Sequence, residues 1–315
     1  MGKASRTKVD SSRREKIAAQ RASARRAEQR RRILIAGGSV LAVIVIIVAF
    51  IVFKANKSST PPTAASTSSL TGTALAGVVS KVTSVPASTL DSVGSGNGAV
   101  SAKPQPVTGG TALTSGGKPE MLYLGAEYCP YCAAERWPMV VALSRFGTFS
   151  GLATIHSASA NGAGSAEPYP NTPTWKFLNA KFSSPYLTFT SVEEQTNIPD
   201  KSTGGYTALQ KPTAAQSALL AKYDAPPYIS SSAAGSIPFV DFGNKYLILG
   251  ASYNPQVLSG LSWSQIATDL SSPSSPVAKA VDGTANYITA AICKMTGNQP
   301  ASACTSTVQS LDNGL

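Results

Sequence analysis

The sequence predicts an α/β domain with a central sheet and flanking helices, preceded by one transmembrane helix. The apolar run 121–126 has the length and composition of a buried strand, and it leads through a Cys-Pro-Tyr-Cys motif at 129–132 into a helical pattern. The second observation is an uncharged run, 33–53, behind a basic N-terminus. The composition, with 14% charged residues, 26 glycines and 21 prolines, argues against a coiled coil or an all-helical bundle.

Residues 33–53 are predicted to form the transmembrane helix. At a rise of about 1.5 Å per residue, the run spans a hydrocarbon core of about 30 Å. A cleaved secretory signal is the alternative, but the apolar core of such a signal is typically about 7 to 15 residues long. Residues 1–32 contain 12 Lys and Arg, whereas only Lys54 and Lys57 closely follow the run. This bias places the N-terminus in the cytoplasm and the C-terminal domain outside the cell membrane.

The net charge of +11 comes mainly from the cytoplasmic tail, residues 1–32. After residue 32 the chain has 15 Lys and Arg against 13 Asp and Glu. The tail is interpreted as a topology signal along the inner leaflet, and contact with anionic lipid or nucleic acid is the alternative. We therefore expect the lipid bilayer as a partner, through 33–53, and no nucleic acid.

Residues 54–115 are predicted to form a flexible stalk. They are rich in Ser, Thr, Gly, Ala and Pro and contain few large apolar residues, so they bury too little surface to offset the loss of chain entropy. Helical spacing of four apolar residues indicates one loosely packed element in the stalk: Leu75, Val78, Val79 and Val82. The folded domain is then expected over 116–315.

The Cys-Pro-Tyr-Cys motif is predicted to lie where a strand turns into a helix. Cys129 falls at the N-cap and Pro130 at the first helical position, which suits proline because no N–H is needed there. Free N–H groups and the positive end of the helix dipole would lower the pKa of the Cys129 thiol. Cys132 lies one turn deeper in the helix. We therefore expect Cys129 to attack a substrate disulfide and Cys132 to resolve the mixed disulfide.

Metal and haem sites are alternative uses of this cysteine spacing. Cys-x-x-Cys is half of a zinc site, but ten residues separate Cys293 from Cys304, which is not a second zinc knuckle. A c-type haem requires histidine after the second cysteine, and Ala133 follows Cys132. We expect neither a metal nor a cofactor.

Three further elements are predicted downstream. Residues 152–156 form a strand, and 235–242 with 246–250 form two strands around a tight turn, with Pro238 at the entry of the hairpin. Ser262 and Gln265 have the spacing of a capping box, so a helix is expected to begin there.

This order of elements resembles the thioredoxin superfamily over roughly residues 118–275. The matching motifs are the Cys-Pro-Tyr-Cys of 129–132 and Ile237-Pro238. The resemblance implies a thioredoxin-like central sheet and a cis peptide bond before Pro238, facing the active cysteine. It also implies that the Ile237 backbone pairs with the bound polypeptide. Ile237, Pro238 and Tyr131 are the substrate-binding candidates.

The stretch 125–137, with the anchor, is most similar to a membrane-linked prokaryotic family catalogued as domain of unknown function 929. Residues 160–234 are predicted to form a Pro-rich insertion with helical pieces at 174–182 and 213–223. In related periplasmic oxidoreductases such an insertion caps the active site. Cys-Pro-Tyr-Cys is associated with glutaredoxins, whereas strongly oxidising periplasmic members carry histidine before the second cysteine, so the redox direction stays open.

Together these observations predict a thiol-disulfide oxidoreductase. It would act on thiols or disulfides of exported proteins and exchange electrons with a membrane or extracytoplasmic partner. The alternative is a thioredoxin-like binding or scaffold module in which Cys129 and Cys132 form a structural disulfide.

The remaining candidate residues have roles beside this pair. Cys293 and Cys304 are expected to form a structural disulfide, since they close a short loop in an oxidising compartment; a second redox pair that relays electrons is the alternative. Glu127 is a possible proton relay for Cys132, with a solvated carboxylate at the strand end as the alternative. His156, the only histidine, is expected to serve packing or the surface rather than act as a base.

Overall fold

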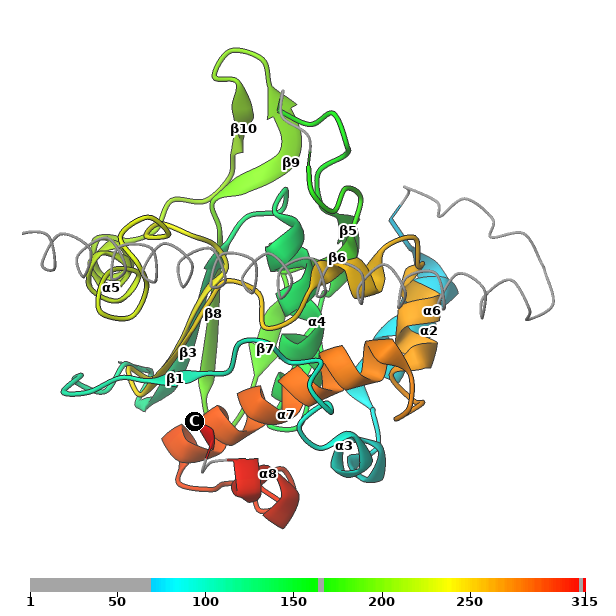
Figure 1. Cartoon of the computed structure of the whole chain (residues 1–315), viewed down its shortest axis with the longest axis vertical. Coiled ribbons are helices and arrows are strands. Elements are labelled where there is room, and N and C mark those ends of the chain that lie inside the picture. The colour runs from blue at the N-terminus through cyan, green and yellow to red at the C-terminus, as the bar shows by residue number, and fades with distance from the viewer. Residues whose placement is uncertain (1–68, 164–166, 312–313) are drawn as a thin grey trace, which may run out of the picture. The chain divides into compact units, whose positions relative to one another are not determined.

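A computed structural model describes residues 69–163, 167–311 and 314–315 (Figure 1). The predicted cytoplasmic tail 1–32, the predicted transmembrane helix 33–53 and the start of the predicted stalk lie outside the described residues. Within the described ranges, no helix has both the length and the apolar character that a membrane crossing requires.

The core of the fold is a mixed central sheet of six strands. They are β1 (Gln105–Pro106), β2 (Thr114–Ser115), β3 (Lys118–Gly125), β8 (Thr188–Glu193), β11 (Phe239–Phe242) and β12 (Tyr246–Leu249). Strand β3 is central: it runs parallel to β8 and antiparallel to β11. On the far side of β11 the sheet continues through β12 to β1, while β2 pairs with the start of β3.

Strand β3 is apolar throughout its second half because both of its faces are covered. Met121 and Tyr123 point into one hydrophobic cluster, and Leu122 and Leu124 point into a second cluster on the opposite face. All four side chains are buried. Because successive residues of a strand face opposite sides, a strand buried on both sides is a continuous apolar run rather than an alternating one.

Helices cover both faces of this sheet. The larger cluster contains α4 (Pro130–Leu143) and α7 (Pro276–Thr296), and α5 (Ala214–Tyr223) contributes to the smaller one. Figure 1 shows α4 and most of α7 to the right of strands β3 and β8, and α5 to their left. Shorter elements complete the larger cluster: α2 (Gly72–Thr83), α3 (Ala87–Val93), η1 (Pro255–Leu258), α6 (Trp263–Asp269) and α8 (Ser306–Leu311).

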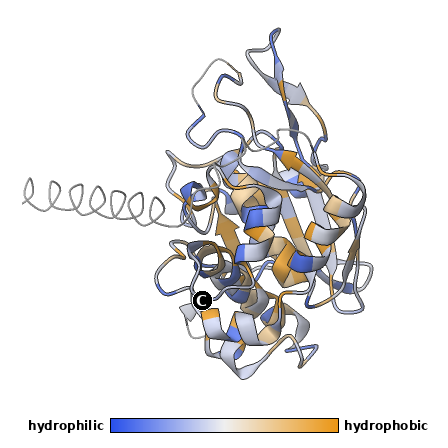
Figure 2. Ribbon diagram, turned by 90° about the vertical axis from the view of Figure 1, so that its right-hand side faces the viewer, coloured by the Kyte–Doolittle hydropathy of each residue, from blue (hydrophilic) through white to orange (hydrophobic). Residues whose placement is uncertain are grey.

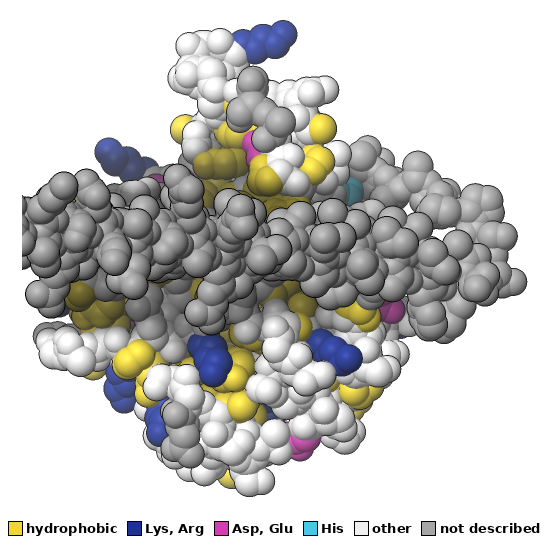
Figure 3. Space-filling model, in the orientation of Figure 1, with side chains coloured by type: hydrophobic (Ala, Val, Ile, Leu, Met, Phe, Trp, Pro, Cys, Tyr) yellow, Lys and Arg dark blue, Asp and Glu magenta, His cyan; other side chains and the backbone are white. Residues whose placement is uncertain are grey.

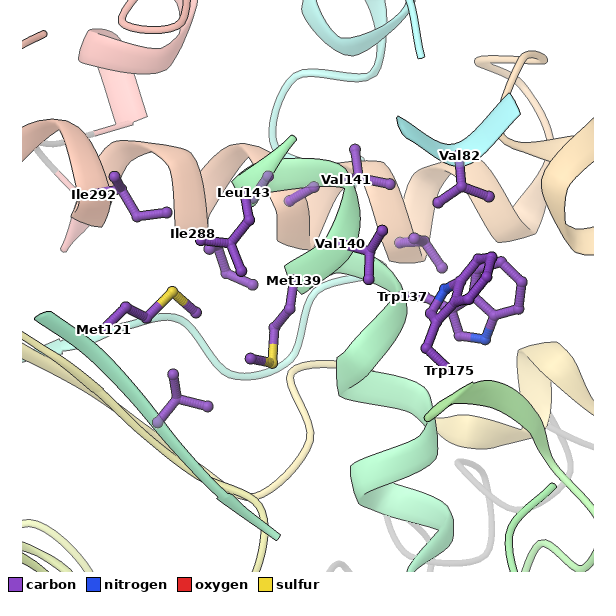
Figure 4. Close-up of a cluster of buried hydrophobic side chains, with 14 of the residues drawn as sticks. Val82, Met121, Trp137, Met139, Val140, Val141, Leu143, Trp175, Ile288 and Ile292 are labelled. Carbon is purple, nitrogen blue, oxygen red and sulfur yellow. The ribbon is translucent and has the colours of Figure 1, made fainter. Parts of the chain in front are cut away.

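Helix α4 lies in the interior of the domain. Nearly all of its side chains are buried, as expected for a helix that packs on every side. Figure 4 shows Trp137 of α4 beside Trp175 and Val82, and Figure 2 shows hydrophobic residues concentrated in the central elements. The indole of Trp137 donates a hydrogen bond to the carbonyl of Pro173 at 2.8 Å, so the helix is fixed by polar as well as apolar contacts.

Helix α7 is the longest described helix, and the sequence analysis did not predict it. Ser275 caps its start by accepting a hydrogen bond from the N–H of Ala278, Pro276 occupies its first turn, and Gly297 ends it in the left-handed conformation with φ of 65°. These three signals are visible in the sequence. They could have located the helix without its tertiary partners.

The predicted flexible stalk 54–115 differs from the structure over its described part. Residues 72–93 form α2 and α3, and 105–106 and 114–115 pair with the central sheet. Val78, Val82 and Leu90 are fully buried. Composition underestimated this segment because the few apolar residues of α2 lie on one helical face, which packs against α4 and α6, and α3 packs against α7.

The predicted insertion 160–234 also differs from the structure. Strand β8, the parallel neighbour of β3, lies inside it, whereas the predicted strand 152–156 corresponds to β5 (Ala153–His156), which pairs with β6 (Pro173–Lys176) in a separate two-stranded sheet. The predicted helical piece 174–182 is instead β6, a loop and the start of β7 (Lys181–Ser183), which pairs with β4 (Thr148–Ser150). Short apolar runs fit both periodicities, and only long-range pairing separates them.

Several other predictions are confirmed. The hairpin forms as β11 and β12, α5 covers most of 213–223, and Ser262 and Gln265 make the predicted capping box at the start of α6. Beyond the sheet, β9 (Gln195–Asp200) and β10 (Gly205–Ala208) form a projecting hairpin. On the face shown in Figure 3, Lys and Arg side chains stand singly among uncharged ones, in keeping with the near charge balance after residue 32.

Candidate active site

Cys129 occupies the N-cap of α4, as predicted. Its backbone is extended, with φ of −73° and ψ of 121°, and Pro130 is the first helical residue. The Cys129 sulfur accepts a hydrogen bond from the backbone N–H of Cys132 at 3.2 Å. Both thiols are free, and their exposed fractions are 4% for Cys129 and 0% for Cys132. The strand-to-helix junction thus places one sulfur at the surface of the site and the other beneath it.

The pKa values of the two thiols are shifted in opposite directions. Burial alone would raise the pKa of Cys129, but hydrogen bonds from the Cys132 thiol and N–H, together with the Arg136 cation, outweigh it and lower that pKa. Burial raises the pKa of Cys132 well above its usual range, and the neighbouring Cys129 adds to the rise. Cys129 is therefore the member of the pair that forms a thiolate more readily. The thiolate is the nucleophile in disulfide exchange.

The hairpin entry lies beside this pair. The bond between Ile237 and Pro238 is cis, as predicted, and the Cys129 thiol lies 3.7 Å from the carbonyl oxygen of Ile237. Ile237 also packs against a small buried cluster that contains both cysteines. Long-range pairing of β11 with β3 brings these residues together, because β3 ends just before the cysteine motif and β11 begins just after Pro238.

Aromatic side chains surround the mouth of the site. Tyr131 is 39% exposed, and its ring contacts Tyr169 edge to face at 5.8 Å between centroids. Tyr128 stacks on Tyr206 of β10, with centroids 4.2 Å apart, and the Tyr206 hydroxyl donates a hydrogen bond to Glu167 at 2.6 Å. The loop between β5 and β6 and the β9–β10 hairpin are thereby attached to the cysteine motif. Tyr206 and Tyr169 were not predicted as site residues.

Glu127 is buried rather than solvated. Its carboxylate forms an ion pair with Lys176 at 3.2 Å, and its backbone N–H donates to the carbonyl of Gln195 at 2.9 Å. The alternative of a solvated strand-end carboxylate is therefore wrong. The proton-relay role of Glu127 stays a prediction.

A buried ion pair lies beneath the cysteines, and the sequence analysis did not find it. Arg136 Nε and Nη2 donate to the two carboxylate oxygens of Glu193 at 2.9 and 2.7 Å, and Nη2 also donates to the carbonyl of Ala126 at 2.8 Å. Both side chains are fully buried. Although burial opposes the charge, the Glu193 carboxylate raises the pKa of Arg136, which stays cationic. Arg136 lies four residues after Cys132 on α4, a spacing that indicates a shared helix face.

Tyr123 is a second residue that the sequence analysis missed. Its hydroxyl is buried and has no hydrogen-bond partner among the described residues. A β-carbon placed on Gly125 would stand 2.2 Å from this hydroxyl oxygen and 3.0 Å from the Cys132 sulfur. The ring also lies 5.7 Å from the Arg136 guanidinium. Position 125 thus requires glycine, because any side chain there would occupy the space beside the Tyr123 hydroxyl and the Cys132 sulfur.

The other cysteines form a separate structure. Cys293, in the last turn of α7, is bonded to Cys304, with their Cα atoms 5.8 Å apart, which confirms the predicted disulfide. His156 packs against the ring of Trp263, with centroids 4.3 Å apart. In the described ranges no group of three or more His, Cys, Asp or Glu side chains is arranged to hold a metal ion.

A family model described as a domain of unknown function (DUF929) matches residues 107–294, more than half of the 315-residue chain. The match confirms the family resemblance seen in the stretch 125–137. It includes both cysteines of the motif and Ile237-Pro238, and it ends before Cys304. No curated protein and no solved structure matches the chain.

Proposed function

We propose that this chain, which belongs to the family described as domain of unknown function DUF929, is a membrane-anchored thiol-disulfide oxidoreductase. It would act outside the cell membrane on the thiols or disulfides of exported proteins. One observation carries the proposal: the free Cys129 thiol lies at a helix N-cap, accepts a hydrogen bond from the Cys132 N–H at 3.2 Å, and has a lowered pKa. A structural cysteine has no need of such an environment.

In the proposed reaction, the Cys129 thiolate attacks one sulfur of a substrate disulfide. A mixed disulfide forms, and the other substrate sulfur leaves as a thiolate and takes up a proton. Cys132 then loses its proton and attacks the Cys129 sulfur. The Cys129–Cys132 disulfide forms, the second substrate sulfur leaves and is protonated, and two electrons have passed to the substrate. The reverse sequence oxidises a dithiol, so the same site serves either direction.

The topology supports a thioredoxin-like arrangement for this chemistry. Strand β3, helix α4 and the parallel strand β8 are followed by the antiparallel hairpin β11–β12, with Ile237-Pro238 at its entry. In that arrangement the Ile237 backbone would pair with an extended substrate segment, and Tyr131 would line its path. The carbonyl oxygen of Ile237, 3.7 Å from the Cys129 thiol, supports this placement.

Trapping of mixed disulfides tests the proposal. In intact cells, Cys132→Ser should accumulate mixed disulfides with exported proteins, because the Cys129 thiolate attacks and nothing resolves the product. Cys129→Ser should trap none, and the double variant Cys293→Ser, Cys304→Ser is the matched control that keeps the motif intact. Equal trapping by both single variants would remove Cys129 from the attacking role.

The second candidate is a binding or scaffold module with a structural Cys129–Cys132 disulfide. The low exposure of Cys129, 4%, is the observation in its favour. The two candidates differ in redox behaviour: an exchange enzyme has a pair that a mild dithiol reduces reversibly, whereas a structural disulfide resists reduction. A measured reduction potential of the pair separates them, and the same value indicates the direction of electron flow.

The anchor and orientation are part of the proposal. Protease added to intact cells should remove the chain after residue 54, since the basic tail is expected in the cytoplasm. Protection of the domain until the cells are lysed would contradict this orientation.

A further inference from the structure

The resolving step has a chemical requirement that the cysteines do not meet by themselves. Cys132 must become a thiolate before it attacks the Cys129 sulfur, yet it lies fully buried. Burial destabilises an anion unless a cation or a hydrogen-bond donor faces it. The Arg136 cation supplies part of this stabilisation from below. Because Arg136 is also paired with Glu193, a neutral hydrogen-bond donor beside Cys132 would add to the stabilisation of its thiolate.

Tyr123 is the group in position to be that donor. Its hydroxyl oxygen and the Cys132 sulfur flank the same small space above Gly125, which a β-carbon would fill. The hydroxyl has no other partner among the described residues, so its proton is uncommitted. Leaving a buried hydroxyl without a partner is destabilising, which makes an otherwise unused one a functional candidate.

Resting on the proposed exchange chemistry, we propose that the Tyr123 hydroxyl donates a hydrogen bond to the Cys132 sulfur when that sulfur becomes a thiolate. The donor and the acceptor are brought together by β3 and α4, and Gly125 leaves the room between them. No electron or proton is consumed in this contact. The proton that Cys132 releases balances the one that the departing substrate sulfur gains.

The charges around Tyr123 keep it a donor rather than a base. Burial raises the pKa of Tyr123 well above its usual range; Arg136 opposes the rise, and Cys132, Glu193 and Cys129 add to it. The hydroxyl therefore stays protonated at neutral pH. Its edge-to-face contact with Phe177, with centroids 5.5 Å apart, holds the ring in place.

Tyr123→Phe is the direct test, because it removes one oxygen atom and leaves the ring. The full chain, reduced in detergent, is loaded at Cys129 with the aromatic thiol of Ellman's reagent. Release of that thiol then reports the attack by Cys132. We expect Tyr123→Phe to slow the release about tenfold between pH 6 and 8, since a hydrogen bond to a charged group is worth about one pKa unit or more. An unchanged rate would overturn the proposal.

Tyr223→Phe is the matched control. Tyr223 is also a buried tyrosine, but it packs in the cluster on the opposite face of the sheet. Its substitution should leave the release rate unchanged. An equal slowing in both variants would show a general effect of losing a buried hydroxyl and would overturn the role of Tyr123.

A second measurement separates a chemical role from a loosened fold. In the Cys129→Ser background, Cys132 is the only free thiol of the four cysteines, because Cys293 and Cys304 are bonded. Losing the donor should slow alkylation of Cys132 and move its pH midpoint upward, whereas a loosened fold would speed alkylation at every pH. Faster alkylation in Tyr123→Phe would therefore overturn the proposal.

Failure of the proposal and failure of the proposed function are distinguishable. If Cys129 does not take up the aromatic thiol at all, the exchange function fails, while the alkylation of Cys132 still tests Tyr123. If loading and release proceed and Tyr123→Phe is as fast as the unchanged chain, only the role of Tyr123 fails.

Discussion

The two cysteine pairs of this protein lie at opposite kinds of helix end. Cys129 and Cys132 begin α4, and Cys293 belongs to the last turn of α7. At a helix N-terminus the free N–H groups and the dipole stabilise a thiolate, whereas at a C-terminus the carbonyl groups disfavour one. The first pair is free and the second is a disulfide that joins α7 to the segment after it.

The difference teaches that the two pairs are distinguished by the surroundings of their cysteines rather than by burial. Cys129 and Cys304 are about equally buried, with exposed fractions of 4% and 3%. Beneath the first pair lie a buried cation, Arg136, and the uncommitted Tyr123 hydroxyl, while Cys304 and Cys293 pack into the main hydrophobic cluster. Polar groups close to a sulfur favour its thiolate, and apolar ones leave a disulfide inert.

The largest expected effect is on disulfide exchange, when cysteines of the two pairs are replaced in turn. Cys129→Ser should lower disulfide exchange by about a thousandfold or more, because the attacking sulfur is gone. The double variant Cys293→Ser, Cys304→Ser should retain exchange within about twofold. Reduction of a small fluorescent disulfide by the full chain measures both. Comparable losses in the two variants would end the distinction between a reactive and a structural pair.

The next effect is on stability, and it should fall on the other pair. Removing the Cys293–Cys304 bond should lower the free energy of unfolding by about 3 kcal/mol, because the bond closes a loop of about 12 residues. Thermal melting of the double serine variant measures this. Loss of exchange without loss of stability would instead indicate that this pair relays electrons.

Varying the pH should sharpen the contrast between α4 and α7. Asp282 of α7 is buried with no partner for its carboxylate among the described residues, and burial raises its pKa to about 8. In the unfolded chain its pKa is about 3.9. Between these values the folded state holds a proton that the unfolded state has lost, so stability falls as the pH rises from about 4 to 8. Cys129 has the opposite effect on stability, because its pKa is lowered in the folded state: the unfolded state holds the proton more tightly, so stability rises with pH up to the ordinary thiol pKa of about 8.5.

Asp282→Asn tests this assignment. The melting temperature of the unchanged chain should be lower at pH 8 than at pH 5, and the variant should show a smaller decrease. Burial also raises the pKa of Glu135 of α4 to about 7, so Glu135 contributes to the decrease in melting temperature in both proteins. A melting temperature that rises from pH 5 to pH 8 would contradict the assignment.

The smallest effect is expected at Glu127. Its partner Lys176 keeps 33% of its side chain exposed, so the ion pair is partly solvated. Glu127→Gln should change the free energy of unfolding by about 1 kcal/mol or less and slow exchange by only a few-fold. Chemical denaturation and the exchange assay measure the two quantities. A tenfold or greater loss of exchange at unchanged stability would make Glu127 an obligatory proton carrier.

Local signals were sufficient for much of the fold. The β3–α4 junction, the β11–β12 hairpin and the capping box of α6 each depend on residues close in sequence. Strand β8 was missed because its assignment depends on parallel pairing with β3, in which the paired residues are 68 positions apart, as in Glu120 and Thr188. The helical spacing of α2 was recognised in the sequence, but its firm packing was not, because its apolar face is narrow and gains its stability from helices far along the chain.

The candidate site divides in the same way. Cys129, Cys132, Ile237 and Pro238 were identified from motifs, and the structure brings them together. Arg136, Glu193 and Tyr123 carry no motif. Only the packing of β8 and α4 against β3 reveals that they meet beneath the cysteines.

The pH dependence of Cys129 alkylation tests the central claim most directly. The full chain is reduced under conditions that spare the Cys293–Cys304 bond, alkylated briefly across pH 4 to 10, and the labelled cysteines are identified by mass spectrometry. The account predicts that Cys129 is labelled first, with a midpoint below the ordinary thiol pKa of about 8.5. A midpoint at or above 8.5, or labelling of Cys132 before Cys129, would contradict it.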